Sequence, residues 1–456
     1  MSNWHQGEGD VNHSPFREQW NQSIPKGTAE VLQEDEQYFL HQSLSTPCLD
    51  VIDQAQGSAF YTKDGKRVLD FHGNAVHQVG FQHPVVIQSM KDQLEQLSFS
   101  TRRYTNARAI ELAKRLADIA PGTLNKTLIA PSASSAVSMA LKLARIATGK
   151  YKTLSMWESF HGASMDAVSV GGEAHFRQQM GPLLPDAIHL PPIQNYRPNW
   201  EGADLDDRQL ASYVEYILEQ ETDIGAFIIE TIRNTDVQLP SQAFMQKIRK
   251  LCTEHNVKLI FDETVVALGR TGCWFAFEHY GVIPDMVIMG KGLGGAVYPM
   301  AALLADESLD TAGHTSIGHY THEKSPLGST AALAVLDIIE EEKLLERVPL
   351  LETHVRERLT EMMQRFPLIG DIRHKGLLFA VELVKDRSTK EKADEEAEAV
   401  MYSCLQKGLS FKLSKGNVIQ LCPPLNISRE DLEQGLSALE KALYESQQRK
   451  EITNEG

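Results

Sequence analysis

Two short apolar runs decide the fold: VKLIF at residues 257–261, which ends at Asp262, and MVIMG at residues 286–290, which ends at Lys291. Such runs are typical of buried parallel strands whose last side chains reach the C-terminal edge of a sheet. Ligands of open α/β sheets bind at that edge. An acid and an amine delivered there suit pyridoxal phosphate (PLP), because the amine can form a Schiff base and the acid can keep the pyridine nitrogen protonated. A buried ion pair between neighbouring strands would explain the same two residues.

The sequence around these runs favours the cofactor over the ion pair. It reads DETVVALGRTG at residues 262–272, FAFEHYG at 275–281 and GKGLGG at 290–295. This pattern and its spacing resemble the signature of the class III (omega-type) aminotransferases. By this resemblance Lys291 is the Schiff-base lysine and Asp262 is the partner of the pyridine nitrogen. The resemblance also implies the fold of the PLP-dependent transferases of fold type I.

Composition limits the possible functions. The 456 residues can bury a large core, and a net charge of −16 argues against a nucleic-acid or anionic-membrane surface. The five cysteines are scattered and form no CxxC pair, which favours a reducing compartment and no metal site. The polar N-terminus lacks a signal-peptide core, and no apolar run approaches the ~20 residues that span a bilayer. These features predict a cytoplasmic protein.

The order of the expected elements predicts an α/β fold with two main domains. Strands and helices alternate from residue 127, which indicates a mainly parallel sheet flanked by helices, of the seven-stranded type found in the resembling family. A helix over residues 331–345 is expected to begin a smaller α+β C-terminal domain. The first 25 residues are polar and predict a loosely ordered arm. The expected division is an N-terminal arm and helix (residues 1–58), a large PLP-binding domain (59–325) and a small C-terminal domain (326–456).

The segment PSASS at residues 131–135 lies between an expected strand and an expected helix. Backbone N–H groups and the helix dipole at such a position favour a phosphate group. A serine that only caps the helix would give the same pattern. The class III aminotransferases carry Asn, Gly and Glu where this chain has Pro131, Ala133 and Ser135. The resemblance still implies phosphate binding through the Ala133 N–H and Ser134.

Further cofactor contacts follow only from the resemblance. It implies that Phe160, in the motif FHG at residues 160–162, stacks on the ring and that Glu230 lies near the ring. Val265 stands where the family has a glutamine that contacts the ring 3-hydroxyl. Thr321 aligns with a threonine that reaches the PLP phosphate of the other subunit, which implies a homodimer with active sites at the interface.

The segment NVIQLCPPL at residues 417–425 bears on the reaction. The class III aminotransferases have an arginine at the position of Gln420, where it holds the carboxylate of an α-amino acid. Gln420 cannot supply that charge, and losing such a contact costs on the order of a few kcal/mol. Either the substrate lacks an α-carboxylate, or the reaction needs no second substrate.

Basic residues elsewhere suit a different anion. The segment TRRYTN at residues 101–106 resembles that of ethanolamine-phosphate phospho-lyases, and Arg233 replaces a glutamine of the family. Any one of these cations alone could be an ordinary surface residue. Together they provide the charge-assisted hydrogen bonds that a phosphonate or phosphate dianion needs. The substrate-binding candidates are therefore Arg103, Tyr104, Arg233, Lys412 and Gln420.

The pattern of the whole chain resembles the PLP-dependent ammonia-lyases of bacterial phosphonate degradation. This implies elimination of water and ammonia from a small amino-alcohol phosphonate to give phosphonoacetaldehyde. Lys291 would remove the proton beside the nitrogen and protonate the leaving hydroxyl. The alternative is an omega-aminotransferase that passes the amino group of an amine or aminophosphonate to an oxo acid. A catalytically silent regulator with the same fold is a third possibility, against which the presence of both Lys291 and Asp262 argues.

Overall fold

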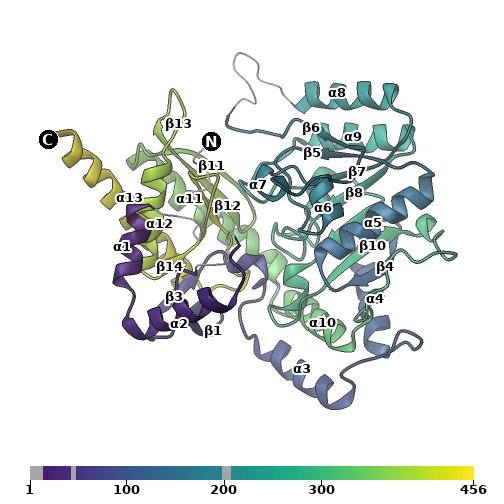
Figure 1. Cartoon of the computed structure of the whole chain (residues 1–456), viewed down its shortest axis with the longest axis horizontal. Coiled ribbons are helices and arrows are strands. Elements are labelled where there is room, and N and C mark those ends of the chain that lie inside the picture. The colour runs from purple at the N-terminus through teal and green to yellow at the C-terminus, as the bar shows by residue number, and fades with distance from the viewer. Residues whose placement is uncertain (1–13, 43–47, 198–206, 456) are drawn as a thin grey trace. The chain divides into compact units, whose positions relative to one another are not determined.

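A computed structural model describes residues 14–42, 48–197 and 207–455 (Figure 1). Contacts divide the chain into two compact units. The first unit comprises the described residues up to His83, Thr235–Val237 and the residues from Arg347 onward; the second comprises Pro84–Asn234 and Gln238–Glu346. This division differs from the expected one, since residues 59–83 group with the first unit and residues 326–346 with the second. The domain boundaries expected at residues 58 and 325 stay a prediction.

The second unit is built on a sheet that has seven strands within the described residues, in the order β4-β10-β9-β8-β7-β5-β6. The strands from β9 to β6 are parallel, whereas β10 is antiparallel to both β4 and β9. The predicted α/β fold with a mainly parallel sheet is therefore confirmed. The strands are β4 (Leu124–Ala130), β5 (Lys152–Met156), β6 (Ala187–Leu190), β7 (Ile224–Glu230), β8 (Lys258–Asp262), β9 (Met286–Met289) and β10 (Ala301–Asp306).

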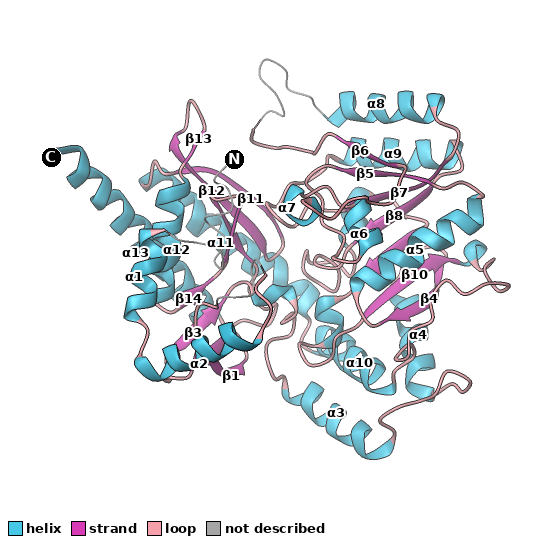
Figure 2. Cartoon of the chain, in the orientation of Figure 1, coloured by secondary structure: helices cyan, strands magenta, loops and turns pink. Residues whose placement is uncertain are grey.

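Both faces of this sheet are covered. One face packs on α5 (Ala133–Thr148) in a core that includes Ile228, Ile260 and Ile288. The alternate residues Phe227 and Leu259 are also fully buried, as expected for a parallel sheet with cover on both sides. Figure 2 shows helices around the strands of this unit. They are α3 (Pro84–Gln96), α4 (Ala107–Ile119), α6 (Met165–Val170), α7 (Ala174–Arg177), α8 (Asp207–Gln220), α9 (Gln242–Glu254) and α10 (Pro326–Glu341), with short 3-10 turns η3 (Ala276–Tyr280), η4 (Lys291–Gly294) and η5 (Glu307–Leu309).

Helix α10 begins five residues before the predicted start. Ser325 caps it by accepting a hydrogen bond from the Gly328 N–H at 3.2 Å, and Pro326 occupies the first helical position. The helix packs against α3 and α4 of the second unit. These contacts group it with the sheet-bearing unit, where the sequence alone had suggested the start of another domain.

The first unit contains two small sheets, in the orders β1-β2-β3-β14 and β11-β12-β16-β15, with β13 paired to β12. Helices accompany the strands, and within the described residues no helix combines the length and apolar character needed to cross a membrane. The elements are α1 (Pro15–Ser23), α2 (Lys26–Tyr38), β1 (Ile52–Gln56), β2 (Ala59–Thr62), β3 (Arg67–Asp70), η2 (Gly73–Ala75), α11 (Leu344–Arg365, which starts in the second unit), β11 (Ile369–Lys375), β12 (Leu378–Asp386), β13 (Glu391–Lys392), α12 (Asp394–Gln406), β14 (Leu409–Ser410), β15 (Lys412–Ser414), β16 (Val418–Leu421) and α13 (Arg429–Glu455).

Part of the expected N-terminal arm is helical. Residues 1–13 lie outside the described residues, but the following stretch forms α1, capped by Ser14. The indole N–H of Trp20 donates to the Leu49 carbonyl at 2.8 Å, and its ring lies 6.0 Å from that of Tyr402. The prediction of a loose arm was wrong for α1, because one buried tryptophan anchors a stretch whose composition is otherwise polar.

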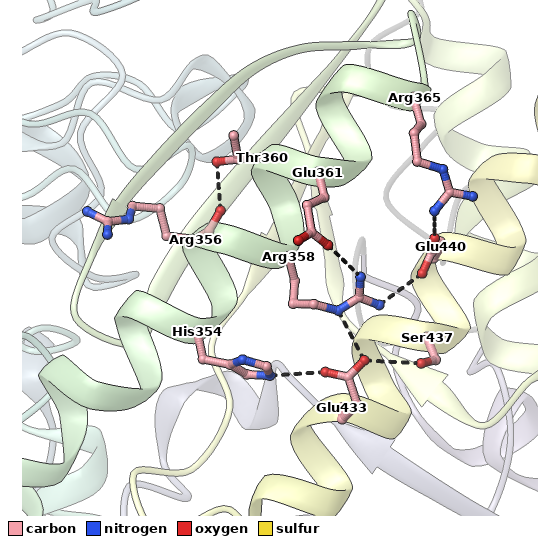
Figure 3. A network of polar contacts seen from close by, with 9 residues as sticks. All are labelled: His354, Arg356, Arg358, Thr360, Glu361, Arg365, Glu433, Ser437 and Glu440. Atoms are coloured by element: carbon pink, nitrogen blue, oxygen red, sulfur yellow. Dashed lines mark hydrogen bonds and ion pairs between the residues drawn. The ribbon is translucent and has the colours of Figure 1, made fainter.

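Helices α11 and α13 are joined by a network of charged side chains (Figure 3). Arg358 lies at its centre, where it donates to Glu433 at 3.0 Å and to Glu440 at 2.9 Å. Arg358 also contacts Glu361 on its own helix at 3.2 Å, and His354 contacts Glu433 at 3.0 Å. Several carboxylates therefore share one cation.

Replacing Arg358 with methionine is expected to lower the free energy of unfolding by about 1 kcal/mol, because the remaining carboxylates then repel one another. Urea denaturation followed by circular dichroism measures this loss, and molar salt should reduce it by screening the charges. Arg356→Met is the matched control, since its side chain points away from the network in Figure 3. Equal loss in both variants would show that the network contributes nothing specific.

Candidate active site

The carboxyl ends of β7, β8 and β9 bring charged residues together, as the sequence predicts. Glu230 ends β7 and Asp262 ends β8, and the two residues are paired in register across these parallel strands. Strand β9 lies next to β8, and Lys291 follows its end by two residues, at the start of η4. Lys291 is partly buried and has a positive φ of 45°. A non-glycine residue held in that conformation is uncommon and is often found at a functional site.

Asp262 is buried and held as an anion. Its Oδ2 lies 2.9 Å from the Nδ1 of His161, and its Oδ1 accepts from the Thr264 N–H at 3.1 Å and the Thr264 hydroxyl at 2.5 Å. Burial alone would raise the pKa of Asp262, but the hydrogen bond and charge of His161 and the two bonds from Thr264 hold that pKa below its ordinary value. An ionised carboxylate here can stabilise a positive charge placed against it.

The contact between His161 and Asp262 was not predicted. The motif FHG was noticed, but His161 and Thr264 were absent from the expected site residues. An ionised carboxylate can only accept, so the Nδ1 of His161 carries the proton. Its Nε2 is buried without a hydrogen-bond partner in the described residues. A buried polar atom of this kind calls for a further group at the site.

Glu230 differs electrostatically from Asp262. It accepts hydrogen bonds from the backbone N–H groups of Phe160 at 3.0 Å and Asn234 at 2.9 Å. Burial nevertheless raises the pKa of Glu230 to about 7, with a further rise from the charge of Asp262. Two neighbouring carboxyl groups thus have pKa values pushed in opposite directions, a pattern that is frequent at catalytic sites.

The start of α5 lies against the same strand ends. Ser132 caps the helix by accepting from the Ser135 N–H at 3.2 Å, so Ala133 and Ser134 occupy its first two positions. Their N–H groups make no hydrogen bond within the described residues, as is usual at a helix start. The residue before Lys291 is close by, because a Cβ added to Gly290 would lie 3.5 Å from the Cβ of Ala133 and 3.4 Å from Thr264.

The turn after β5 contacts the start of α5. The Oγ of Ser134 accepts from the Ala163 N–H at 3.2 Å. Gly162 has φ +125°, and a Cβ added to it would lie 2.2 Å from that Oγ. Only glycine can occupy this position without moving Ser134.

Gly162→Ala is therefore expected to displace Ser134 and to lower the affinity for a bound phosphate group at least about tenfold, since one charge-assisted hydrogen bond is worth roughly 1.5–3 kcal/mol. Retention of PLP during dialysis, followed by absorbance, measures the effect. Gly149→Ala is the control, because Gly149 also has a positive φ but has open space around its Cα. Similar loss of PLP in both variants would attribute the effect to backbone strain alone.

The loop after β8 is fixed by a buried glutamate. Glu263 accepts from the N–H groups of Ala276 and Phe277, both at 2.7 Å. Burial raises the pKa of Glu263 to about 7. This anchor positions Thr264 and the buried Val265 beside Asp262. Phe160 is partly buried, and its ring centroid lies 4.5 Å from that of Phe176.

The predicted anion-binding residues differ in burial. Arg233 is buried, forms an ion pair with Glu158 at 3.1 Å, and lines a small pocket with Glu230. Arg103 and Tyr104 are exposed in the loop between α3 and α4, and Thr321 is exposed in the loop before α10. Their roles stay predictions.

Lys412 and Gln420 belong to the first unit. They are paired directly across the antiparallel strands β15 and β16, so their side chains share one face of that sheet. Gln420 is buried, and Lys412 is partly exposed. Nothing in the sequence pattern predicted this pairing.

Comparison with known proteins agrees with this geometry. The sequence matches the class-III aminotransferases over residues 41–443. The chain belongs to this family. A relative from Vibrio splendidus (strain 12B01), the (R)-1-hydroxy-2-aminoethylphosphonate ammonia-lyase, is 49% identical over 452 residues, or 96% of this chain and 94% of the relative. The structure of a Bacillus anthracis aminotransferase matches at 30% identity with a TM-score of 0.84, over 92% of this chain and 99% of that one. A PLP-bound amine transaminase from an uncultivated Pseudomonas species matches at 28% identity with a TM-score of 0.82, over 90% and 99% of the two chains.

The site of this family member fits pyridoxal phosphate. The start of α5 offers N–H groups for a phosphate, and Lys291 offers the amine for the aldehyde. The ionised Asp262 offers a partner for the pyridine nitrogen. The Nε2 of His161 is a buried polar atom that has no hydrogen-bond partner within the described residues. All of these residues belong to the second unit.

Proposed function

We propose that this chain is a PLP-dependent ammonia-lyase that converts (R)-1-hydroxy-2-aminoethylphosphonate to phosphonoacetaldehyde and ammonia in phosphonate catabolism. The similarity to the Vibrio splendidus lyase, at 49% identity along nearly the full length of both chains, carries this proposal. The replacement of the expected arginine by Gln420 supports it, because a lyase does not need to hold the carboxylate of an α-amino acid.

The cofactor and Lys291 have separate roles in the proposed reaction. When bound, PLP would supply an aldehyde that can react with the substrate amine and a ring that can accept electrons from the adjacent carbon. The amine of Lys291 removes the proton from that carbon and then protonates the hydroxyl that leaves from the next carbon. The water lost in this elimination is taken up again in hydrolysis, so the net products are aldehyde and ammonia. No amino acceptor is consumed.

The neighbouring side chains maintain the charge that this chemistry needs. Asp262 stays ionised through its contacts with His161 and Thr264, and it therefore favours a protonated pyridine nitrogen. We assign the phosphate to the Ala133 N–H and Ser134, ring contacts to Phe160, Glu230 and Val265, and a phosphate contact from the second subunit to Thr321. The substrate contacts proposed are Arg103, Tyr104, Arg233, Lys412 and Gln420.

A homodimer is part of the proposal, with the active sites at the subunit interface. Large apolar side chains are exposed along the stretch from α3 to the following loop, including Leu94 (54%), Leu97 (40%) and Tyr104 (73%). Such a concentration of exposed apolar side chains favours a surface that a second subunit covers. A cytoplasmic location is also proposed, on the composition and on the absence of a disulfide among the five cysteines, all of which lie in the described residues.

The test incubates the purified PLP-loaded protein with (R)-1-hydroxy-2-aminoethylphosphonate in the absence of any oxo acid. Ammonia and phosphonoacetaldehyde are expected in equal amounts, over many turnovers. 2-Aminoethylphosphonate, which lacks the leaving hydroxyl, is the matched control and should release no ammonia.

An omega-aminotransferase remains the second candidate, because the solved relatives include an amine transaminase and the family takes its name from this reaction. Activity that requires pyruvate or another oxo acid, and that stops after one turnover without it, would establish this alternative and exclude the lyase.

A further inference from the structure

A short stretch of chain after β7 belongs to the first unit, although the residues on either side of it belong to the second. This stretch is Thr235–Val237. Its base is closed within the second unit, where the Arg233 N–H donates to the Gln238 carbonyl at 3.1 Å and the Gln238 N–H donates back at 3.2 Å. We call residues 234–237 the tether loop. The chain therefore leaves and re-enters the second unit at one hydrogen-bonded pair.

The tip of the tether loop is held by a buried arginine of the first unit. The Nε and Nη2 of Arg373, on β11, donate to the Asp236 carbonyl at 3.1 and 3.0 Å. Arg373 is 5% exposed, and its Nη1 donates to the carboxylates of Glu382 at 2.8 Å and Asp371 at 2.5 Å. Lys415 adds an ion pair with the Asp236 carboxylate at 3.4 Å. A planar guanidinium with this many partners is fixed in one orientation, so it also fixes the Asp236 carbonyl.

The backbone of the tether loop needs such support. Val237 is fully buried and has a φ of +52°. A β-branched residue rarely adopts a positive φ, and this conformation persists only where surrounding contacts impose it. The contacts of Arg373 and Lys415 with the preceding residue, Asp236, are of this kind. We therefore expect the loop to relax when they are removed.

The first residue of the tether loop contacts the candidate active site. The Asn234 N–H donates to one carboxylate oxygen of Glu230 at 2.9 Å, and the Phe160 N–H donates to the other at 3.0 Å. Burial raises the pKa of Glu230 to about 7, and the hydrogen bond from Asn234 opposes that rise. Asn234 is only two residues from Asp236, so a movement of the Asp236 carbonyl reaches this N–H through two rigid peptide units.

Other charged groups also face Glu230. His161, in the turn after β5, lowers the pKa of Glu230, whereas Asp262, at the end of β8, raises it. Arg233 lines the same small pocket as Glu230 and is paired with Glu158 at 3.1 Å. All of these groups lie in the second unit, so a change made in the first unit leaves their side chains in place.

We propose that Arg373 is a positioning residue of the active site, which acts on Glu230 through the tether loop. It fixes the Asp236 carbonyl, and the loop in turn fixes the Asn234 N–H against the carboxyl group of Glu230. This inference rests on the proposed place of Glu230 beside the ring. A purely structural arginine would stabilise the first unit alone, and its loss would change neither the amides after β7 nor the ionisation of Glu230.

The first experiment measures hydrogen exchange in the PLP-loaded full chain. The variant combines Arg373→Met with Glu382→Gln, because removal of only one partner of a buried ion pair can unfold a protein. Amides of residues 231–238 should exchange at least about tenfold faster than in the wild type, since the loop loses its fixed partner. Lys415→Met should accelerate the same amides by a smaller factor. Wild-type exchange at residues 231–238 in the double variant would overturn the proposal.

Two controls separate this effect from a general loosening of the first unit. Arg387→Met removes another arginine of that unit, one that donates to the Ile369 carbonyl at 2.9 Å and the Phe366 carbonyl at 3.0 Å. Glu382→Gln alone keeps Arg373. Both should leave exchange at residues 231–238 unchanged. An acceleration in either control equal to that of the double variant would contradict the positioning role.

The second experiment follows the ionisation of Glu230 through the absorbance of the bound cofactor as the pH is varied without substrate. A hydrogen bond to the charged form lowers a pKa, so weakening the Asn234 bond should move the midpoint upward, by about one pH unit in the double variant. The midpoint should disappear in Glu230→Gln and stay in place in Arg387→Met.

Two results of the pH titration would overturn the proposal. An unshifted midpoint in the double variant would mean that the loop does not position the carboxyl group, and a midpoint that survives in Glu230→Gln would mean that the cofactor does not sense it. If exchange and midpoint change as expected but the wild type releases no ammonia from (R)-1-hydroxy-2-aminoethylphosphonate, the proposed function fails while the positioning role of Arg373 stands.

Discussion

Lys291→Ala should abolish the release of ammonia from (R)-1-hydroxy-2-aminoethylphosphonate, with a fall in kcat of at least about 10⁴-fold. The amine of Lys291 is the group proposed to remove the substrate proton and to protonate the leaving hydroxyl. Alanine can do neither, and it cannot bind PLP covalently. The measurement is an ammonia assay with excess PLP, together with the absorbance band of the lysine-bound cofactor, which should be lost.

The lysine variant needs a test of folding, because Lys291 has a positive φ in η4. Thermal unfolding should stay close to that of the wild type, since the replaced side chain is only partly buried. Lys250→Ala, which removes a surface lysine paired with Glu254 at 3.6 Å on α9, is expected to keep full activity. If Lys291→Ala kept the lysine-bound absorbance band, the assignment of the Schiff-base residue would be wrong.

Asp262→Asn should lower kcat by roughly 10²–10³-fold, because a neutral amide no longer stabilises the positive charge on the pyridine nitrogen. The substitution is nearly isosteric, so packing around β8 should persist. The pKa of Asp262 is held below its ordinary value, so the carboxylate that this substitution removes is ionised throughout the neutral range. Steady-state kinetics at neutral pH measure the size of the loss.

Asp306→Asn serves as the control for this prediction. The pKa of Asp306 is also lowered. This residue ends β10 and caps η5 by accepting a hydrogen bond from the Ser308 N–H at 2.9 Å. Its replacement should change stability slightly and kcat not at all. An Asp262→Asn variant with wild-type kcat would remove the carboxylate from the chemistry and leave it as a structural partner of His161.

The two runs that end at Asp262 and Lys291 predicted neighbouring strand ends correctly, because a charged residue that stops a buried apolar run is a local feature. Strand β10 was not predicted. The strand is short and mostly apolar. Its antiparallel position between β4 and β9 depends on pairing with segments that are distant in the sequence. The extent of α1 and the grouping of α10 also depended on long-range contacts, through Trp20 and through packing on α3 and α4.

The chemical groups of this protein could be identified from short stretches of its sequence: a lysine and an acid at adjacent strand ends, a serine-rich helix start, and a glutamine in place of the expected arginine. These groups can be predicted from the sequence because strand termination, helix capping and side-chain charge are properties of a few consecutive residues. Three contacts depend on the folded chain: His161 helps to keep Asp262 ionised, Arg233 pairs with Glu158, and Asn106 joins the loop before α4 to the loop before α10. Each contact joins residues that are distant in the sequence, so the protonation or exposure of a side chain depends on neighbours that folding brings to it.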